Sequence, residues 1–230
     1  MRNGMPTNYI NAGALMFFDE SVGELNKRDI LDASLYIQLA ASKKKPKFSE
    51  FDAWYQTYLR AMATFGWVVS AREYDSDPIQ NHGQFDVWSL FKHELERRVP
   101  GSLIQTAECL VMDSPQRFFS PAAHSLLGEY AFRCEGAEGG DPLSRVVLQL
   151  SFVHGASSMT SMFVAFKTLA SGVEHAFFKP LDRNQIVGNL ELASFSAQLS
   201  DLRYAQFRDQ FIAALGARRS TLILALEEHQ

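Results

Sequence analysis

The sequence predicts an α+β fold, with a helical N-terminal half packed on an antiparallel β-meander from the C-terminal half. Two observations predict it. Apolar residues recur with helical spacing through residues 19–127, and they alternate with period two between short turns through residues 128–199. A helix and a short final strand over 200–226 close the fold. Because helices and strands are segregated along the chain, alternating βαβ units are not expected.

The composition is that of a globular protein with a large core. Hydrophobic residues make up 47% of the 230 residues and charged residues 21%. The 18 Phe, 7 Tyr and 3 Trp residues predict a core built largely from rings, each of which buries a large apolar area. A chain of this length needs no disulfide or metal to stabilise it. We therefore expect one domain over residues 1–230 and interpret both cysteines as buried or half-buried thiols.

The first helix is expected over residues 22–42, after an extended lead-in over 1–18. Ser21-Val22-Gly23-Glu24 matches a capping box, in which the Ser and Glu side chains satisfy the first amides. The run Lys43-Lys44-Lys45-Pro46-Lys47 ends the helix, since cations favour its C-terminus and proline stops it.

A second helix is predicted from an N-cap at Ser49 to Gly66, followed by a strand over 67–74. Residues 75–83 are rich in turn formers and indicate a loop. Two further helices are expected over 85–98 and 103–112, and residues 115–127 fit either a loop or a short turn of helix.

Short strands dominate the second half. They are predicted over 130–134, 145–154, 159–169, 175–179 and 189–199, with local turns between them. Local turns favour antiparallel pairing. Ser200-Asp201 then caps a helix that ends at Gly216, and residues 221–226 are interpreted as a closing strand. The expected assembly is an antiparallel sheet with helices on one face, while the state of its other face is left open.

Charge and hydropathy limit the classes of partner that the sequence suggests. The net charge is −4 and no basic face is concentrated in the sequence, so no nucleic-acid partner is expected. No stretch approaches the ~20 apolar residues that span a bilayer. The apolar patch Ala12–Phe18 is short for a signal peptide and has no convincing cleavage site after it. The expected location is the cytoplasm, and contact with a membrane is not supported by this pattern.

Common catalytic and cofactor motifs are absent from the sequence. It contains no phosphate-binding glycine loop, no Gly-x-Ser-x-Gly, no His-Glu-x-x-His and no Cys-x-x-Cys. We therefore expect no cofactor and no metal site. This leaves open whether the protein is an enzyme.

The aromatic residues Trp54, Tyr55, Tyr58 and Trp67 are the candidate ligand-binding residues. They share a face of the second helix and the start of the following strand, where rings line a pocket for a small molecule. Packing in the core is the simpler interpretation of the same pattern.

His154 is a weak catalytic candidate. It follows Ser151 and precedes Ser157 and Ser158, so a Ser-His pair is conceivable if a carboxylate orients the imidazole. Glu174-His175 on a neighbouring strand is the nearest source of such a group. Serines are common in turns, however, and no oxyanion hole is recognisable.

Three further segments have an ordinary interpretation beside a functional one. Asp75, Asp77 and His82 are able to hold a metal but also suit a solvated turn. The lysine run 43–47 suits anionic lipid as well as a solvated helix end. The strands around Ser157–Thr168 resemble a membrane-inserting hairpin and equally a half-exposed sheet.

Together these patterns favour a non-enzymatic binding or protein-interaction module, with an unknown protein or a small molecule as its partner. Two alternatives stay open. One is a membrane-acting effector or toxin-like protein, suggested by the first helix, the lysine run and the Ser/Thr-rich strands. The other is a hydrolase of unfamiliar type that uses His154 and its neighbouring serines. The sequence does not indicate the oligomeric state.

Overall fold

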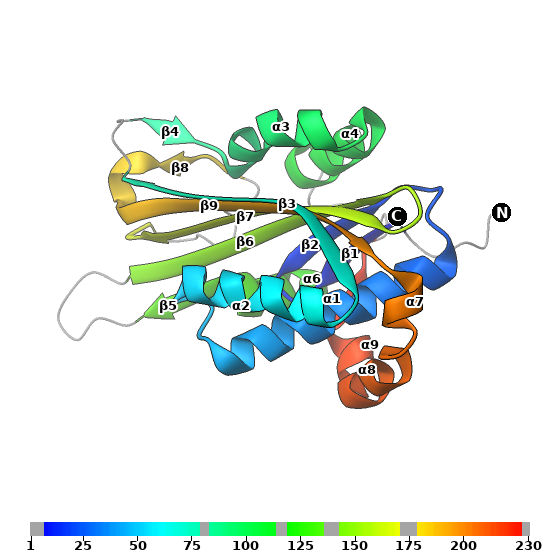
Figure 1. Ribbon diagram of the computed structural model, residues 1–230. Coiled ribbons are helices and arrows are strands. Elements are labelled where there is room, and N and C mark those ends of the chain that lie inside the picture. Colours follow the sequence, from blue (N-terminus) through cyan, green and yellow to red (C-terminus); the bar gives the residue numbers. More distant parts are fainter. Residues whose placement is uncertain (1–6, 79–82, 114–118, 136–142, 171–178, 227–230) are drawn as a thin grey trace.

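The protein has three layers, with a mixed sheet of eight strands between two layers of helices (Figure 1). The computed structural model describes residues 7–78, 83–113, 119–135, 143–170 and 179–226. The α+β class is thus confirmed in its coarse form. One finer expectation is wrong, because the sheet is mixed and not purely antiparallel. The second face, whose state was left open, is also covered by helices.

The strands of the main sheet come from the whole length of the chain. They are β1 (Asn8–Asn11), β2 (Ala14–Phe18), β3 (Trp67–Pro78), β5 (Phe132–Glu135), β6 (Leu143–His154), β7 (Ser158–Thr168), β9 (Ile186–Leu199) and β10 (Ile223–Ala225). Their order is β10-β1-β2-β6-β7-β9-β3, with β5 also paired to β6. The separate pair of β4 (Gln84–Phe85) and β8 (Leu181–Asp182) forms a two-stranded ribbon.

The expected lead-in over residues 1–18 contains two strands of the sheet. β1 and β2 form a hairpin around Ala12, which has a φ of 51°, and β2 then runs parallel to β6. All nine residues of the two strands are buried, so the segment lacks the alternation of a half-exposed strand. This is why the period-two pattern did not reveal it.

The N-terminal half contributes most of the helical cover. Its helices are α1 (Glu24–Lys44), α2 (Phe51–Thr64), α3 (Val87–Arg98), α4 (Gly101–Glu108), a π-helical turn (Cys109–Asp113) and α6 (Pro121–Ala131). The C-terminal segment adds α7 (Asp201–Tyr204), α8 (Arg208–Leu215) and α9 (Arg218–Leu222). Part of the segment expected as a strand over 130–134 belongs to α6, and part of that expected over 221–226 belongs to α9.

Two predicted helix caps are wrong. Ser21 does not cap α1, because its hydroxyl and its amide both donate to Asp19 Oδ1, at 2.5 and 2.9 Å, and Gly23 is the N-cap. Glu50 rather than Ser49 precedes α2, which has no side-chain cap. Local hydrogen bonds of short polar side chains compete with capping.

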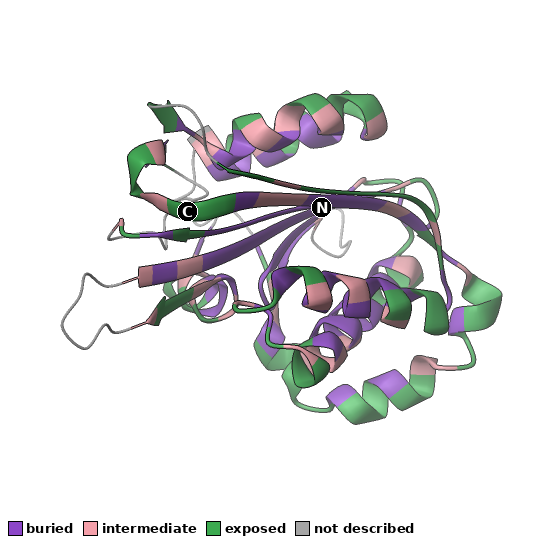
Figure 2. Ribbon diagram, turned by 60° about the vertical axis from the view of Figure 1, so that its left-hand side comes forward, coloured by how far each residue is buried: buried purple, intermediate pink, exposed green. Residues whose placement is uncertain are grey.

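Each face of the sheet has its own core. One core lies under α1 and α2 and includes Trp54, Phe163 and Phe195. The other lies under α3, α4 and α6 and includes Phe91 and Leu148. Figure 2 shows the central strands buried along most of their length and exposed residues on the outer sides of the helices. Burial on both faces explains the nearly continuous apolar runs of β6 and β7.

The two cysteines differ from expectation in one respect. Cys109 and Cys134 are both free and exposed, not buried. Within the residues that the structure describes, no helix combines the length and apolar character needed to cross a membrane.

Candidate functional site

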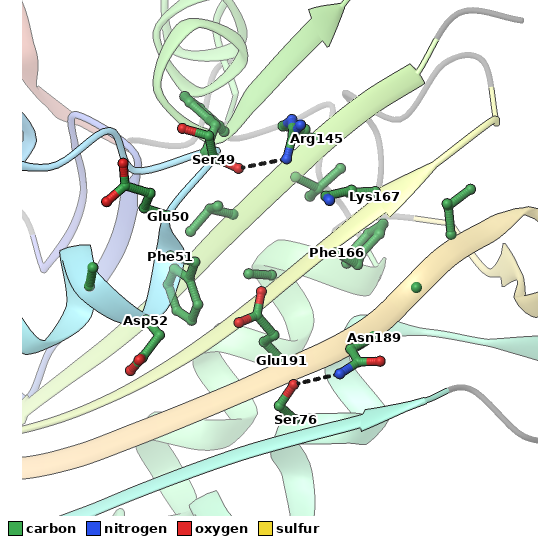
Figure 3. A pocket seen from close by; sticks show the side chains of 17 residues that line it. Ser49, Glu50, Phe51, Asp52, Ser76, Arg145, Phe166, Lys167, Asn189 and Glu191 are labelled. Atoms are coloured by element: carbon green, nitrogen blue, oxygen red, sulfur yellow. Dashed lines mark hydrogen bonds between the residues drawn. The ribbon is translucent and has the colours of Figure 1, made fainter.

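A groove of about 480 Å³ lies between the start of α2 and the adjoining parts of β6, β7 and β9. Figure 3 shows it with side chains from all four elements. Phe51 from α2 and Val147 and Ala165 from the sheet give it an apolar floor, whereas Arg145, Lys167 and other charged residues give it a polar rim. We refer to this cavity as the groove.

A bulge between β7 and β9 forms one side of the groove. Ala165 pairs with Glu191 and Lys167 pairs with Val187, so the three residues 188–190 lie opposite one residue of β7. Gly188 has a φ of 79°, which a residue with a side chain rarely adopts. The bulge widens the sheet here and leaves room for the cavity.

Two cations lie next to each other on the groove's rim. Arg145 of β6 and Lys167 of β7 are directly opposite in the antiparallel register, an arrangement that disfavours two like charges. The Arg145 guanidinium is offset by Glu135, with Nε and Oε1 2.7 Å apart, and it also donates to the Phe48 carbonyl at 3.4 Å. Lys167 is exposed and has no ion pair with any residue that the structure describes.

Two carboxylates, Glu191 and Asp52, lie on either side of Phe51 (Figure 3). Glu191 of β9 accepts a hydrogen bond from the Tyr74 hydroxyl, and burial together with this bond raises the pKa of Tyr74. Asp52 in the first turn of α2 is exposed and, among the described residues, accepts a single long hydrogen bond of 3.4 Å from Gln56. The groove therefore brings side chains of both charges to one cavity.

Helix α2 adds a weaker electrostatic contribution. It begins at Phe51 with no side chain capping its first amides, and its first three residues line the groove. Asp52 in its first turn offsets the partial positive charge of this N-terminus, so the helix adds little to either charged side of the groove. Sequence reasoning missed this site because its charged residues come from separate strands. The available signal was the two cations that interrupt the apolar runs of β6 and β7.

The four predicted ligand-binding aromatics lie together in the core under α2. Trp54, Tyr55, Tyr58 and Trp67 are each at most 1% exposed. The rings of Trp54, Tyr55 and Tyr58 pack around Phe163 at centroid distances of 6.1, 5.5 and 6.0 Å. Phe51 belongs to the same cluster and reaches the groove. A direct role of the four in binding stays a prediction.

His154 lies half-buried near the end of β6, and only one of its three serines shares its face. Ser158 is its register partner. Ser151 lies on the opposite face, 2.8 Å from Ser161 between the two hydroxyls, and Ser157 donates to the Leu199 carbonyl at 2.9 Å. Burial lowers the pKa of His154, and the nearby Asp19 carboxylate opposes this shift. Glu174-His175 lies outside the described residues, and the catalytic role stays a prediction.

The remaining charged segments are located as follows. Asp75 and Asp77 belong to β3, which extends to Pro78, so the loop expected there begins later; His82 lies outside the described residues. No group of three or more potential metal ligands occurs among the residues that the structure describes.

The lysine run is only partly solvated. Lys43 and Lys44 are exposed at the end of α1, and Lys45 pairs with Glu50 at 3.1 Å. Lys47 is buried, which corrects the interpretation of the whole run as a solvated helix end. Its Nζ donates to the Tyr130 carbonyl at 3.0 Å, and burial lowers its pKa to about 7.

No protein-family model matches the sequence. No curated protein matches it either. Similar folds occur among solved structures. A delta-endotoxin has a TM-score of 0.45 and 9% identity, with 86% of each chain covered. The activated Cyt2Ba monomer from Bacillus thuringiensis subsp. israelensis has a TM-score of 0.46 and 11% identity, covering 83% of this chain and 99% of that one.

The Evf virulence factor has a TM-score of 0.38 and 7% identity, covering 96% of this chain and 85% of that one. All three TM-scores are below 0.5 and no identity exceeds 11%. These similarities assign neither a family nor a function to this chain.

Proposed function

We propose that the protein is a non-enzymatic binding protein that holds a small charged ligand in the groove. The observation that carries the proposal is Lys167, which forms no ion pair with the described residues and lies beside Arg145 at the rim of a cavity with an apolar floor. Ligand sites combine an apolar lining with a few converging polar groups. A ligand anion at this position also relieves the repulsion between the two cations.

The proposal is tested by a thermal-melt screen of the purified protein against charged metabolites. A ligand at 100 times its dissociation constant adds about 2.7 kcal/mol to stability. For a chain of this size that is a rise in melting temperature of roughly 5–10 °C. The rise is expected to shrink strongly in Lys167→Met. A hit that stabilises Lys167→Met as much as the native protein would place the ligand elsewhere and count against the groove.

A membrane-acting, toxin-like function is a second candidate, favoured by exposed apolar side chains at one end of the sheet. Leu202, Leu25 and Val68 are 82, 59 and 52% exposed. Leu202 belongs to α7, Leu25 to the start of α1 and Val68 to the start of β3, and these parts lie at the end of the sheet away from the groove (Figure 1).

A hydrogen bond joins two of these segments, since the Ser200 amide before α7 donates to the Gly66 carbonyl before β3 at 3.0 Å. The Asn26 side chain of α1 donates to the Ala156 carbonyl in the turn between β6 and β7 at 2.8 Å. Exposed apolar residues gathered in this way favour insertion into the headgroup region of a bilayer. The names delta-endotoxin and virulence factor belong to structures of similar fold, and the candidate rests on the apolar end alone.

Flotation with lipid vesicles tests this candidate. The native protein is expected to float with vesicles and Leu202→Asp to stay largely in the soluble fraction, because an aspartate opposes burial in the interface. Asp201→Asn, at the neighbouring exposed position, is the control and is expected to float. A native protein that stays soluble with both neutral and anionic vesicles would rule out the candidate. In either case location in the cytoplasm stays a prediction.

A further inference from the structure

We infer that the ligand of the groove is a small zwitterion, with a phosphate at one end and a protonated primary amine at the other. The inference rests on the proposed binding function and names the chemical class of its ligand. A free metabolite and a lipid headgroup share this chemistry, and the experiment below separates the two sources.

The phosphate end is assigned to Arg145 and Lys167. They lie directly opposite each other on adjacent strands, so both reach one group on the same face of the sheet. Glu135 forms an ion pair with Arg145 and acts on Lys167 without a direct ion pair, so one carboxylate faces two cations and the pair keeps an excess of positive charge. A doubly charged anion suits two neighbouring cations, and charge-assisted hydrogen bonds are the strongest that such a site offers.

The amine end is assigned to Glu191 and Asp52. Among the described residues, only Tyr74 donates to Glu191, through Oε1, and only Gln56 donates to Asp52, through Oδ1 at 3.4 Å. Each carboxylate therefore keeps one oxygen for a ligand. A primary ammonium has three N–H donors that match these acceptors.

A primary amine fits better than a quaternary one. A trimethylammonium has no N–H group and is recognised by the open faces of aromatic rings. Phe51, an aromatic ring that lines the groove, is 4% exposed and packs against Tyr55 and Tyr74 at centroid distances of 6.1 and 6.4 Å. Its faces are largely occupied by other rings.

The floor between the two ends matches a short carbon spacer. Phe51, Val147 and Ala165 are buried apolar residues that line the groove between its charged sides. One or two methylene groups placed there lose contact with water without leaving a polar group unsatisfied.

Binding is measured by isothermal titration calorimetry with four probes: phosphoethanolamine, inorganic phosphate, ethanolamine and phosphocholine. Phosphoethanolamine is expected to bind at least tenfold more tightly than each of the others, because only it makes charge-assisted hydrogen bonds at both ends. Lys167→Met and Glu191→Gln are each expected to weaken its binding about tenfold or more. Lys92→Met and Glu96→Gln, on α3 across the sheet, are the matched controls and are expected to bind normally.

Several results would overturn the inference. Phosphate that binds as tightly as phosphoethanolamine would show an anion site and no zwitterion site, and the proposed binding function would then stand. If Glu191→Gln binds phosphoethanolamine as tightly as the native protein does, Glu191 does not hold the amine and that part of the inference is wrong. Binding of none of the four probes would also overturn the inference, whereas the metabolite screen decides the binding function separately.

Vesicles distinguish the two sources of the ligand. If the source is lipid, phosphatidylethanolamine vesicles are expected to retain the native protein more than Lys167→Met, and phosphatidylcholine vesicles to retain both weakly. If the source is a free metabolite, soluble phosphoethanolamine binds and neither kind of vesicle distinguishes the variants. Both results support the inference. Preferential retention by phosphatidylcholine vesicles would contradict it.

Discussion

Replacing Lys47 by methionine is expected to change how the stability of the protein depends on pH. The Lys47 side chain is 8% exposed. Its Nζ donates to the Tyr130 carbonyl and lies 5.8 and 5.4 Å from the ring centroids of Phe48 and Trp54. No described carboxylate forms an ion pair with it. An ammonium in this position has lost most of its hydration. In return it forms one hydrogen bond to a carbonyl and cation–π contacts with two rings.

The size of the effect follows from the pKa. Burial lowers the pKa of Lys47 from its usual value of 10.5 to about 7. Between these two values the unfolded chain binds more protons than the folded one, so the free energy of unfolding rises with pH across this window. At about 1.36 kcal/mol per pH unit, the whole window amounts to roughly 5 kcal/mol of destabilisation that is fully present below pH 7 and gone above about 10.5.

Lys47→Met removes this dependence at the cost of one hydrogen bond. The Tyr130 carbonyl then lacks its donor, which costs about 1–3 kcal/mol. The net expectation at pH 6 is a variant more stable than the native protein by roughly 2–4 kcal/mol. The advantage is expected to shrink as pH rises and to vanish at about pH 8 to 10, where the destabilisation that remains from Lys47 no longer exceeds the cost of the lost hydrogen bond.

Urea denaturation at several pH values between 6 and 10 measures the difference. Other titrating groups are common to both proteins and cancel in the comparison. Lys44→Met, an exposed lysine at the end of α1, is the control and is expected to follow the native curve. Parallel curves for the native protein and Lys47→Met would refute the reasoning, because they would mean that Lys47 stays charged in the folded state at little cost.

Three further substitutions test the packing. Gly13→Ala places a Cβ 2.6 Å from the Tyr130 carbonyl oxygen and 2.9 Å from Lys47 Nζ. The free energy of unfolding is expected to fall by about 2–3 kcal/mol, and an unchanged melting temperature would disprove the close approach. Asp29→Asn breaks the bidentate ion pair with Arg208, whose two nitrogens lie 2.9 and 2.5 Å from the carboxylate. Since Arg208 is partly exposed, the free energy of unfolding measured in urea is expected to fall by about 2–3 kcal/mol. A fall of less than about 0.5 kcal/mol would contradict this expectation. Phe163→Ala opens the ring cluster under α2 and is expected to cost about 3–5 kcal/mol, with a cost below about 1 kcal/mol arguing against tight packing there.

Local patterns predicted the longer helices because their causes are local. The spacing of apolar residues and a final Gly66 were enough to place α2, and the predicted and observed ends of α1 differ by two residues. The cap of α3 at Asp86, which accepts from the Ser89 amide, is also a short-range signal. Such contacts involve residues within one or two turns of each other, so they are visible in the sequence.

The sheet order was beyond sequence reasoning because it depends on distant contacts. β2 pairs with β6 although more than 120 residues separate them. Turn residues indicate which neighbours form a hairpin, but no local signal indicates which strand a buried N-terminal hairpin will join. The cover of the second face was left open for a similar reason, since a strand buried on both faces loses the alternation that reveals its orientation.

The groove was missed for a related reason. Arg145, Lys167 and Glu191 are separated by 22 and 24 positions along the chain and meet only through strand register. Lys47 illustrates the opposite error. Its neighbours in sequence are exposed lysines, so the run suggested a solvated end, whereas the fold carries this one side chain into the interior.

The division of the apolar interior into two cores has a consequence for local opening. The backbone of the sheet separates the side chains under α1 and α2 from those under α3, α4 and α6. Most of the packing of each helical layer therefore lies within its own core, while Leu35 of α1, which packs in the core under α3, α4 and α6, couples the two layers in part. We expect amide hydrogen exchange to show three levels of protection. The central strands should exchange most slowly, and each helical layer should exchange with its own opening free energy.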